Sequence, residues 1–370
     1  MPAVFFYVSG HGFGHSIRQI EIINALLGAR PADLRVVVRT SAPAWLFART
    51  VRGAIELQAA ETDTGVVQID ALRLDERETI ARARAFADRL PALVEREADV
   101  LARGRARFVV SDAPALACAA ARRANVPSVV CSNFTWDWIY RAYASSADGV
   151  DDLVARTAEA YAAADAGWRL PMHGGFESIS PLIDLPFVAR HARTDRSREQ
   201  VRDDLRLPQD RPLALVSFGG YGVERLPLAS LDCTASWGIV LTGGRGDLAH
   251  LPAGVFGVTE DDIYDRALRY EDLVRAVDVV ITKPGYGIIS DCIANGAAML
   301  YTPRGNFPEY DVLVREMPTY LRCEPLEMQT FLDGRWKAGL DRLAAKPPAP
   351  VRARSDGAAV AAARILERLT

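Results

Sequence analysis

Lysine is scarce in this sequence of 370 residues: the chain contains only Lys283, Lys337 and Lys346, and arginine supplies the remaining basic side chains. The net charge of −3 gives no overall positive field, so we expect no nucleic-acid partner. No apolar run reaches the ~18–20 residues of a transmembrane helix. We therefore expect any contact with a membrane to be peripheral.

Paired cysteines are also missing. The five cysteines are odd in number, scattered and without a C-x-x-C pair, at Cys118, Cys131, Cys233, Cys292 and Cys323. This pattern argues against a disulfide framework or a structural zinc site. Residues 1–9 form a short apolar run without a basic segment before it, unlike a secretory signal. Both observations predict a reduced, cytoplasmic location.

Common metal-binding motifs are absent as well. The sequence contains no H-E-x-x-H and no D-x-D pattern. Three pairs of adjacent aspartates occur, at 151–152, 203–204 and 261–262, but they lack the flanking residues of a metal site. We interpret them as solvated faces. A metal-independent function without a resident cofactor is therefore expected.

What the sequence does contain is a regular alternation of strand and helix patterns. Short apolar runs at 4–8, 34–38, 108–111 and 128–131 alternate with helical patterns in the first half, and runs at 213–217, 238–241, 277–282 and 298–301 do so in the second. Such alternation predicts an α/β protein with two parallel sheets, each forming a Rossmann-like domain. We expect domains at 1–170 and 191–350, a proline- and glycine-rich linker at 171–190, and a C-terminal helix at 351–370 that packs back on the first domain.

Glycine-rich loops follow several of these strands, where open parallel sheets bind ligands. The first loop, residues 9–15, reads SGHGFGH, and its spacing differs from the dinucleotide motif G-x-G-x-x-G. It holds two of the five histidines, His11 and His15, and between them Gly14, which we expect to contact the diphosphate of a bound nucleotide. Histidine is the usual general base near neutral pH, so we favour a catalytic role over helix capping for this pair.

A second loop begins with one of the three lysines and precedes a helical pattern. Its residues are Lys283, Pro284, Gly285, Tyr286 and Gly287. Glycines allow close backbone approach, and free amides at a helix N-terminus bind anions. The loop is a candidate cradle for a diphosphate, and an ordinary strand-to-helix turn is the alternative.

Two further segments carry polar and aromatic side chains beyond strand ends. Asn133 and Trp136 follow one strand and could line an acceptor pocket, whereas packing is the alternative for the neighbouring Phe134 and Trp138. The segment 304–311 brings Asn306 and a carboxylate to the expected cleft edge, where sugar hydroxyls need partners.

These residues also match known proteins. The run VSGHGFGHSIRQIEIINAL resembles the glycosyltransferase-like domain at the start of plant and bacterial L-arabinokinases, with its G-H-G-x-G-H-x-x-R pattern. The run DVVITKPGYGIISDCIANGAAMLYTPRGNFPEYD resembles the nucleotide-sugar half of GT-B glycosyltransferases, including the enzyme that adds N-acetylglucosamine to lipid I. The resemblance implies two Rossmann-like domains facing each other across a cleft, with the acceptor on the first and the nucleotide-sugar on the second.

The resemblance also implies roles for individual residues. His15 would lie near the acceptor and the transferred sugar, and the loop at Gly285 would face the diphosphate. Asp291 stands where relatives carry a ribose-binding glutamate. The resemblance assigns further positions to the phosphates (Gly219, Gly220), the base (Tyr270, Leu273) and the donor sugar (Glu309, Tyr310).

The expected function is transfer of a hexosyl or N-acetylhexosaminyl group from a nucleoside-diphosphate sugar, such as a UDP-sugar, to an acceptor hydroxyl by direct displacement. The acceptor could be a small molecule, a glycan or a lipid-linked compound. A nucleotide-sugar hydrolase, a 2-epimerase and a non-catalytic nucleotide-sugar-binding protein remain alternatives, because fold-level analogy does not separate them.

Overall fold

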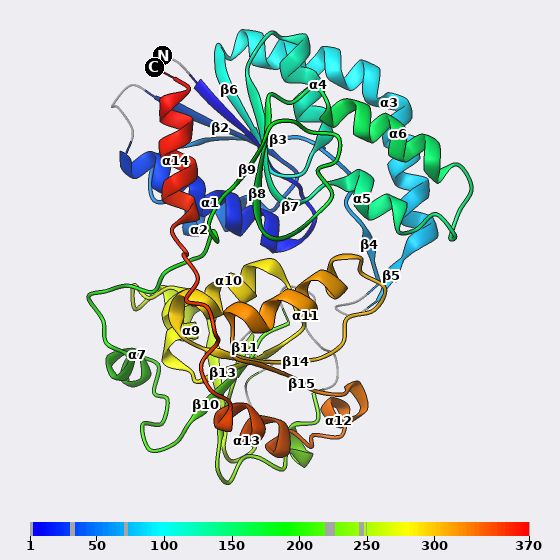
Figure 1. Cartoon of the computed structure of the whole chain (residues 1–370). Coiled ribbons are helices and arrows are strands. Elements are labelled where there is room, and N and C mark those ends of the chain that lie inside the picture. The colour runs from blue at the N-terminus through cyan, green and yellow to red at the C-terminus, as the bar shows by residue number, and fades with distance from the viewer. Residues whose placement is uncertain are drawn as a thin grey trace.

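Two α/β halves lie one above the other, each built on its own parallel sheet (Figure 1). The computed structural model describes residues 3–369 except 30–33, 70–72, 219–225, 244–247 and 249. The short buried runs expected as strands form the sheets, because a parallel sheet covered on both faces favours continuous apolar segments.

The first sheet has seven strands in the order β3-β2-β1-β6-β7-β8-β9, all parallel. The strands are β1 (Ala3–Tyr7), β2 (Arg35–Thr40), β3 (Glu56–Ala59), β6 (Ala106–Ser111), β7 (Ser128–Phe134), β8 (Ala166–Gly174) and β9 (Leu182–Asp184). The central strand β1 is buried along its whole length. The carboxyl ends of β1, β6 and β7 therefore lie next to one another at one edge of the sheet.

Helices cover both faces of this sheet, and a short antiparallel ribbon extends from it toward the second half. The helices are α1 (Gly12–Ala29), α2 (Ala44–Thr50), α3 (Glu76–Arg103), α4 (Ala115–Arg123), α5 (Trp136–Arg141) and α6 (Val150–Tyr161). The ribbon consists of the strands β4 (Val67–Gln68) and β5 (Leu74–Asp75). The Asp75 side chain caps α3 by accepting the backbone N–H of Glu78 at 2.9 Å, which fixes where this long helix begins.

The second sheet has six parallel strands in the order β12-β11-β10-β13-β14-β15. They are β10 (Leu213–Val216), β11 (Gly238–Gly243), β12 (Val255–Thr259), β13 (Val279–Thr282), β14 (Ala298–Tyr301) and β15 (Cys323–Pro325). The surrounding helices are α7 (Arg198–Asp204), α8 (Glu260–Tyr264), α9 (Tyr270–Ala276), α10 (Tyr286–Asn295), α11 (Glu309–Tyr320), α12 (Met328–Leu332) and α13 (Lys337–Ala345), and Leu228–Ser230 forms a 3₁₀ turn.

The stretch expected as a linker, 171–190, contributes to the first sheet instead of joining the halves over its whole length. It contains the end of β8 and all of β9, so the chain crosses to the second half only after Asp184. Buried and half-buried side chains alternate along β8, and the prolines and glycines in this region obscured that strand pattern.

The last helix, α14 (Gly357–Glu367), lies beside α1 on the first half (Figure 1). Its buried side chains Ala361, Ala362 and Ile365 join the core that contains Ile20 and Ile23. The two segments that cross between the halves pair with each other through a bridge between Val188 and Asp356. The halves are thus joined by two adjacent chain segments.

Candidate functional site

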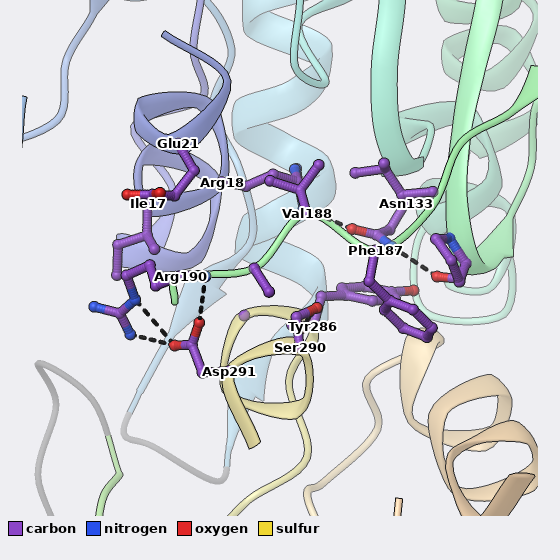
Figure 2. A pocket seen from close by; sticks show the side chains of 14 residues that line it. Ile17, Arg18, Glu21, Asn133, Phe187, Val188, Arg190, Tyr286, Ser290 and Asp291 are labelled. Atoms are coloured by element: carbon purple, nitrogen blue, oxygen red, sulfur yellow. Dashed lines mark hydrogen bonds and ion pairs between the residues drawn. The ribbon is translucent and has the colours of Figure 1, made fainter. Parts of the chain in front are cut away.

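A pocket lies between the two halves, where α1 approaches α10 (Figure 2). Side chains from both halves line it, among them Arg18 and Asn133 from the first and Tyr286 and Asp291 from the second. Glycines allow the backbones to come close here, since a Cβ added to Gly287 would lie 3.9 Å from the Cα of Gly14. The two predicted glycine loops therefore meet at one cleft.

His15 lies in the first turn of α1 and is buried. Its Nδ1 is hydrogen-bonded to Oδ2 of Asp112, the residue that directly follows β6. An ionised carboxylate only accepts hydrogen bonds, so Nδ1 carries a hydrogen, and in a neutral imidazole ring Nε2 is then the nitrogen with the lone pair. This is the arrangement of a histidine that is oriented to accept a proton at Nε2.

Arg18, one turn further along α1, holds the same carboxylate. Its Nε donates to Oδ1 of Asp112 at 3.1 Å, its Nη1 donates to Oδ1 of Asn133 at 2.8 Å, and Gln19 donates to Asp112 at 3.2 Å. Burial alone would raise the pKa of Asp112, but the charges of Arg18 and His15 lower it to about 2. Asp112 is therefore ionised at neutral pH and held rigidly.

A second carboxylate, Asp63, lies in the loop between β3 and β4. Its Oδ2 accepts from Nε1 of Trp136 at 2.8 Å, and its Oδ1 accepts from Oγ of Ser9 at 3.0 Å. Burial raises the pKa of Asp63 to about 6, and the charge of His15 opposes that rise in part. Two carboxylates with very different proton affinities thus flank the histidine network: Asp112 is bonded to His15, and Asp63 is bonded to Trp136.

His11 packs against this group. Its ring centre lies 6.1 Å from that of His15 and 6.0 Å from that of Trp136, with the rings edge to face. A Cβ on Gly65, whose φ is +61°, would lie 2.5 Å from Cβ of His11, so only glycine lets the loop lie against the imidazole. Burial, together with His15, Arg304 and Lys283, lowers the pKa of His11 to about 3, so this histidine is neutral at pH 7.

The two residues expected in an acceptor pocket, Asn133 and Trp136, are both buried. Asn133 accepts from Arg18 and donates to the Pro171 carbonyl at 2.8 Å. The Trp136 ring stacks on His15 with 6.2 Å between centres. Trp136 thus packs on the histidine network, and Asn133 holds Arg18 while also lining the pocket between the halves.

The second glycine loop joins β13 to α10. Gly285 is the N-cap of α10 in an extended conformation, and a Cβ at this position would meet nothing within 4 Å. The first amides of α10 lack partners within the helix, as at every helix start, and Lys283 lies in the same loop. The loop combines a cation, open space and helix-terminal amides, which is the chemistry of an anion site.

Asp291, on α10, is held by Arg190 of the crossing segment. Its Oδ1 accepts the backbone N–H of Arg190 at 3.0 Å, and its Oδ2 accepts from Nε at 3.0 Å and from Nη2 (Figure 2). The carboxylate is almost fully buried. The Asp291 carboxylate, which the resemblance assigns to the ribose hydroxyls, is therefore bonded to the guanidinium of Arg190 in this structure.

The positions assigned to the base lie next to that arginine. The guanidinium of Arg190 lies 4.9 Å from the centre of the Tyr270 ring, and the Tyr270 hydroxyl lies 2.5 Å from Oγ of Ser217. Leu273 is fully buried in the core of the second half. Gly219 and Gly220, assigned to the phosphates, lie outside the described residues.

The segment after β14 reaches across to the first half. Asn306 donates to Oε1 of Glu76 at 2.5 Å and accepts at its carbonyl from the Tyr143 hydroxyl at 3.3 Å. Glu309 accepts from Arg304 at 3.0 Å, and Tyr310 packs against the first half's aromatic core, which also holds Phe307. Of the residues predicted for the donor sugar, Asn306 and Tyr310 thus contact the first half, whereas Glu309 is paired within the second.

Three residues of the network were not singled out from the sequence: Asp112, Asp63 and Arg18. Asp112 directly follows the strand at 108–111, and Arg18 is the arginine of the G-H-G-x-G-H-x-x-R pattern, so both carried a usable signal. Asp63 lies in an irregular loop and carried none.

Among the described residues, metal-binding clusters and membrane-spanning helices are both absent. No group of three or more histidine, cysteine, aspartate or glutamate side chains in the described ranges is placed to hold a metal ion. None of the helices that the structure describes combines the length and the apolarity needed to cross a bilayer.

The architecture and the cleft between its halves define the class: the chain has the GT-B fold. Its similarity to the glycotransferase of kitacinnamycin covers 100% of this chain and 99% of that one, with a TM-score of 0.65 and 18% identity. UGT2 of Phytolacca americana, solved with UDP-2fluoro-glucose and pterostilbene, has a TM-score of 0.60 and 10% identity over 100% of this chain and 94% of that one.

Among individual proteins, L-arabinokinase of Arabidopsis thaliana is 30% identical over 349 residues, which are 93% of this chain and 32% of that protein. The UDP-N-acetylglucosamine--N-acetylmuramyl-(pentapeptide) pyrophosphoryl-undecaprenol N-acetylglucosamine transferase of Clavibacter michiganensis subsp. michiganensis is 28% identical over 199 residues, 52% of this chain and 48% of that protein. The chain spans about a third to a half of the length of these relatives, and no protein-family profile matches it. The predicted fold class and the predicted resemblance are confirmed.

Proposed function

We propose that this chain is a glycosyltransferase that transfers a hexosyl or N-acetylhexosaminyl group from a nucleoside-diphosphate sugar to an acceptor hydroxyl. The observation that carries the proposal is the oriented pair of His15 and Asp112 beside the close approach of two glycine loops, where Gly14 of the first half lies next to Gly287 at the start of α10. Two solved structures with this fold, UGT2 of Phytolacca americana with UDP-2fluoro-glucose and glycosyltransferase VinC with DTDP, support a nucleotide at this kind of cleft.

The acceptor side supplies the base. Nε2 of His15 takes the proton from the acceptor hydroxyl, and the oxygen forms a bond to the anomeric carbon of the donor. Asp112 keeps the imidazole in the required tautomer and stabilises the positive charge that the ring gains. Arg18 fixes Asp112 so that the carboxylate does not take the proton itself.

The donor side stabilises the leaving group. As the new bond forms, the bond between the anomeric carbon and the diphosphate oxygen breaks, and negative charge grows on the diphosphate. Lys283 and the first amides of α10 would offset this charge, so the step needs no metal ion and no resident cofactor. The nucleotide-sugar acts as a co-substrate.

The test is a transfer assay with a panel of UDP-, TDP-, GDP-, CDP- and ADP-sugars and hydroxyl acceptors, in the presence of a metal chelator. We expect transfer from one donor base, a loss of kcat of at least about 10²-fold in His15→Ala, and an unchanged dissociation constant for the nucleoside diphosphate. His250→Ala, at an exposed histidine, is the matched control.

Three outcomes would contradict the proposal. Turnover near wild type in His15→Ala would remove the assigned base. Release of free sugar at the same rate with and without acceptor would indicate a hydrolase. Absence of binding of every nucleotide tested would remove the donor site.

A further inference from the structure

Asp63 has no role in the proposed transfer steps, although its carboxylate is bonded to Trp136, whose ring stacks on His15. Its carboxylate follows β3 in the loop of residues 60–66, above the carboxyl ends of β1 and β7. These are the strand ends at which open parallel sheets bind their ligands. The side chain is partly exposed, whereas Asp112 beneath His15 is fully buried.

The partners of the two carboxylates differ in charge. Asp112 is held by the guanidinium of Arg18, and Asp63 accepts hydrogen bonds from two neutral side chains, Ser9 and Trp136. Each oxygen of Asp63 receives one of these bonds. A carboxylate has about four acceptor positions, so both oxygens can accept further donors.

The position of Asp63 is fixed relative to His15 by a shared neighbour. The Trp136 ring stacks on the imidazole of His15 with 6.2 Å between centres, and its Nε1 donates to Asp63 at 2.8 Å. The loop that carries Asp63 is also held against His11, because Gly65 leaves room for that ring. A ligand hydroxyl placed at His15 therefore has a preoriented carboxylate nearby.

We infer that Asp63 accepts a hydrogen bond from a second hydroxyl of the acceptor, and that the acceptor is a polyhydroxylated compound such as a sugar. The inference rests on the proposed function for the role of His15. A compound with one hydroxyl would satisfy His15 and give Asp63 no donor beyond Ser9 and Trp136. A site that positions a hydrogen-bond acceptor for a ligand hydroxyl discriminates against ligands that lack that hydroxyl.

The raised pKa of Asp63, about 6, is consistent with this assignment. It shows that the protein alone stabilises the ionised form poorly, since burial outweighs the two neutral hydrogen bonds. Hydroxyl groups from a ligand would supply the missing donors. Asp63 is thus a specificity-determining residue, distinct from the base and its orienting partner.

The experiment compares wild type, Asp63→Asn and Asp63→Ala by saturation-transfer NMR and calorimetry. The probes are methyl pyranosides of pentoses and hexoses, and 4-methylphenol as a ligand with one hydroxyl. Titrations are run without nucleotide and with saturating UDP or TDP. Glu61→Gln, in the same loop and exposed, is the matched control because it makes the same carboxylate-to-amide change.

We expect wild type to bind at least one methyl pyranoside. Asp63→Asn should weaken that binding by about ten-fold or more, as for loss of a hydrogen bond to a charged group. Glu61→Gln, the affinity for UDP or TDP, and the affinity for 4-methylphenol should not change. In a transfer assay, Asp63→Asn should raise the acceptor KM more than it lowers kcat.

Three results would overturn the inference: wild type binds none of the pyranosides, Asp63→Asn binds them as wild type does, or both variants lose 4-methylphenol and pyranosides equally, which would indicate a purely structural role. The proposed function is tested separately by nucleotide binding. If UDP, TDP and the other nucleotides do not bind, that function fails, and the titrations without nucleotide still decide whether Asp63 holds a polyol.

Discussion

The two walls of the cleft are built differently. On the first half, side chains from three strand ends and α1 form a connected network in which His15, Asp112 and Arg18 hold one another. On the second half, the wall is mainly a glycine loop and the start of α10, and its buried carboxylate Asp291 is turned toward the crossing segment. In the proposed function, the first wall would serve proton transfer and the second would bind an anion through backbone groups.

The two buried aspartate–arginine pairs sharpen this contrast. Asp112 and Arg18 belong to the same half, and their contact orients a histidine. Asp291 and Arg190 join α10 to the segment that connects the halves, and Arg190 covers the Tyr270 ring. Similar aspartate–arginine chemistry thus holds a histidine on one wall and ties α10 to the connecting segment on the other.

Asp112→Asn should produce the largest effect on transfer, because it removes the carboxylate that orients His15. The amide cannot hold the imidazole in the required tautomer, so we expect kcat to fall by about 10²–10⁴-fold. The dissociation constant of the nucleoside diphosphate should stay within threefold of wild type. The measurement is steady-state transfer combined with calorimetry.

The control for this variant is Asp99→Asn, at an exposed aspartate of α3. A melting curve must show that Asp112→Asn is folded, because Arg18 is left without its carboxylate. If kcat is unchanged in a folded Asp112→Asn protein, the first wall does not act through this pair.

The contrast between the walls also marks what sequence reasoning can reach. The strands at 4–8 and 108–111 and the glycine loops were predictable, because apolar runs and glycines act locally. The pairing of His15 with Asp112, 97 positions away, and of Asp291 with Arg190, 101 positions away, depends on tertiary structure. No local pattern specifies such contacts.

The same reason explains the two regions where expectation and structure differ in detail. Asn306 meets Glu76 across the halves, 230 positions away in the sequence, so its neighbours could not be inferred from its own loop. In the stretch 171–190, prolines and glycines indicated a linker, whereas pairing of β8 with β9 extends the sheet through Asp184.

Lys283→Ala tests the second wall. Loss of the lysine removes a cation from the anion site, so we expect the affinity for UDP or TDP to fall by about ten-fold, with a smaller salt dependence. Lys337→Ala, an exposed lysine paired with Asp341, is the matched control. Equal nucleotide affinity in Lys283→Ala and wild type would assign the diphosphate to another part of the cleft.

Asp291→Asn separates attachment from nucleotide binding. Because the Asp291 carboxylate is already bonded to Arg190, we expect the nucleotide affinity of this variant to change less than threefold. Breaking the buried ion pair should lower the free energy of unfolding by about 3 kcal/mol. Denaturant unfolding and calorimetry measure the two effects. A double-mutant cycle with Arg190→Met should show strong coupling. A large loss of nucleotide affinity at unchanged stability would instead support the ribose contact.

The last difference concerns the two carboxylates near His15 and depends on pH. The pKa of Asp63 is raised to about 6 in the folded state from 3.8, so the folded protein binds more protons than the unfolded chain between these values. The free energy of unfolding contributed by Asp63 therefore rises as the pH falls from 7 toward 4, by on the order of 2 kcal/mol. Asp112 has the opposite sign: its pKa is lowered to about 2, so its contribution is present above pH 4 and is lost below it.

Asp63→Asn removes the titrating group and keeps its shape, so the difference in unfolding free energy between wild type and this variant should grow in favour of wild type as the pH is lowered from 7.5 to 4.5. Glu61→Gln should show no such trend, because Glu61 is an exposed side chain. The comparison needs only chemical denaturation at several pH values and no knowledge of the substrate. A pH-independent difference would mean that folding does not raise the pKa of Asp63, and the contrast between the two carboxylates would no longer hold.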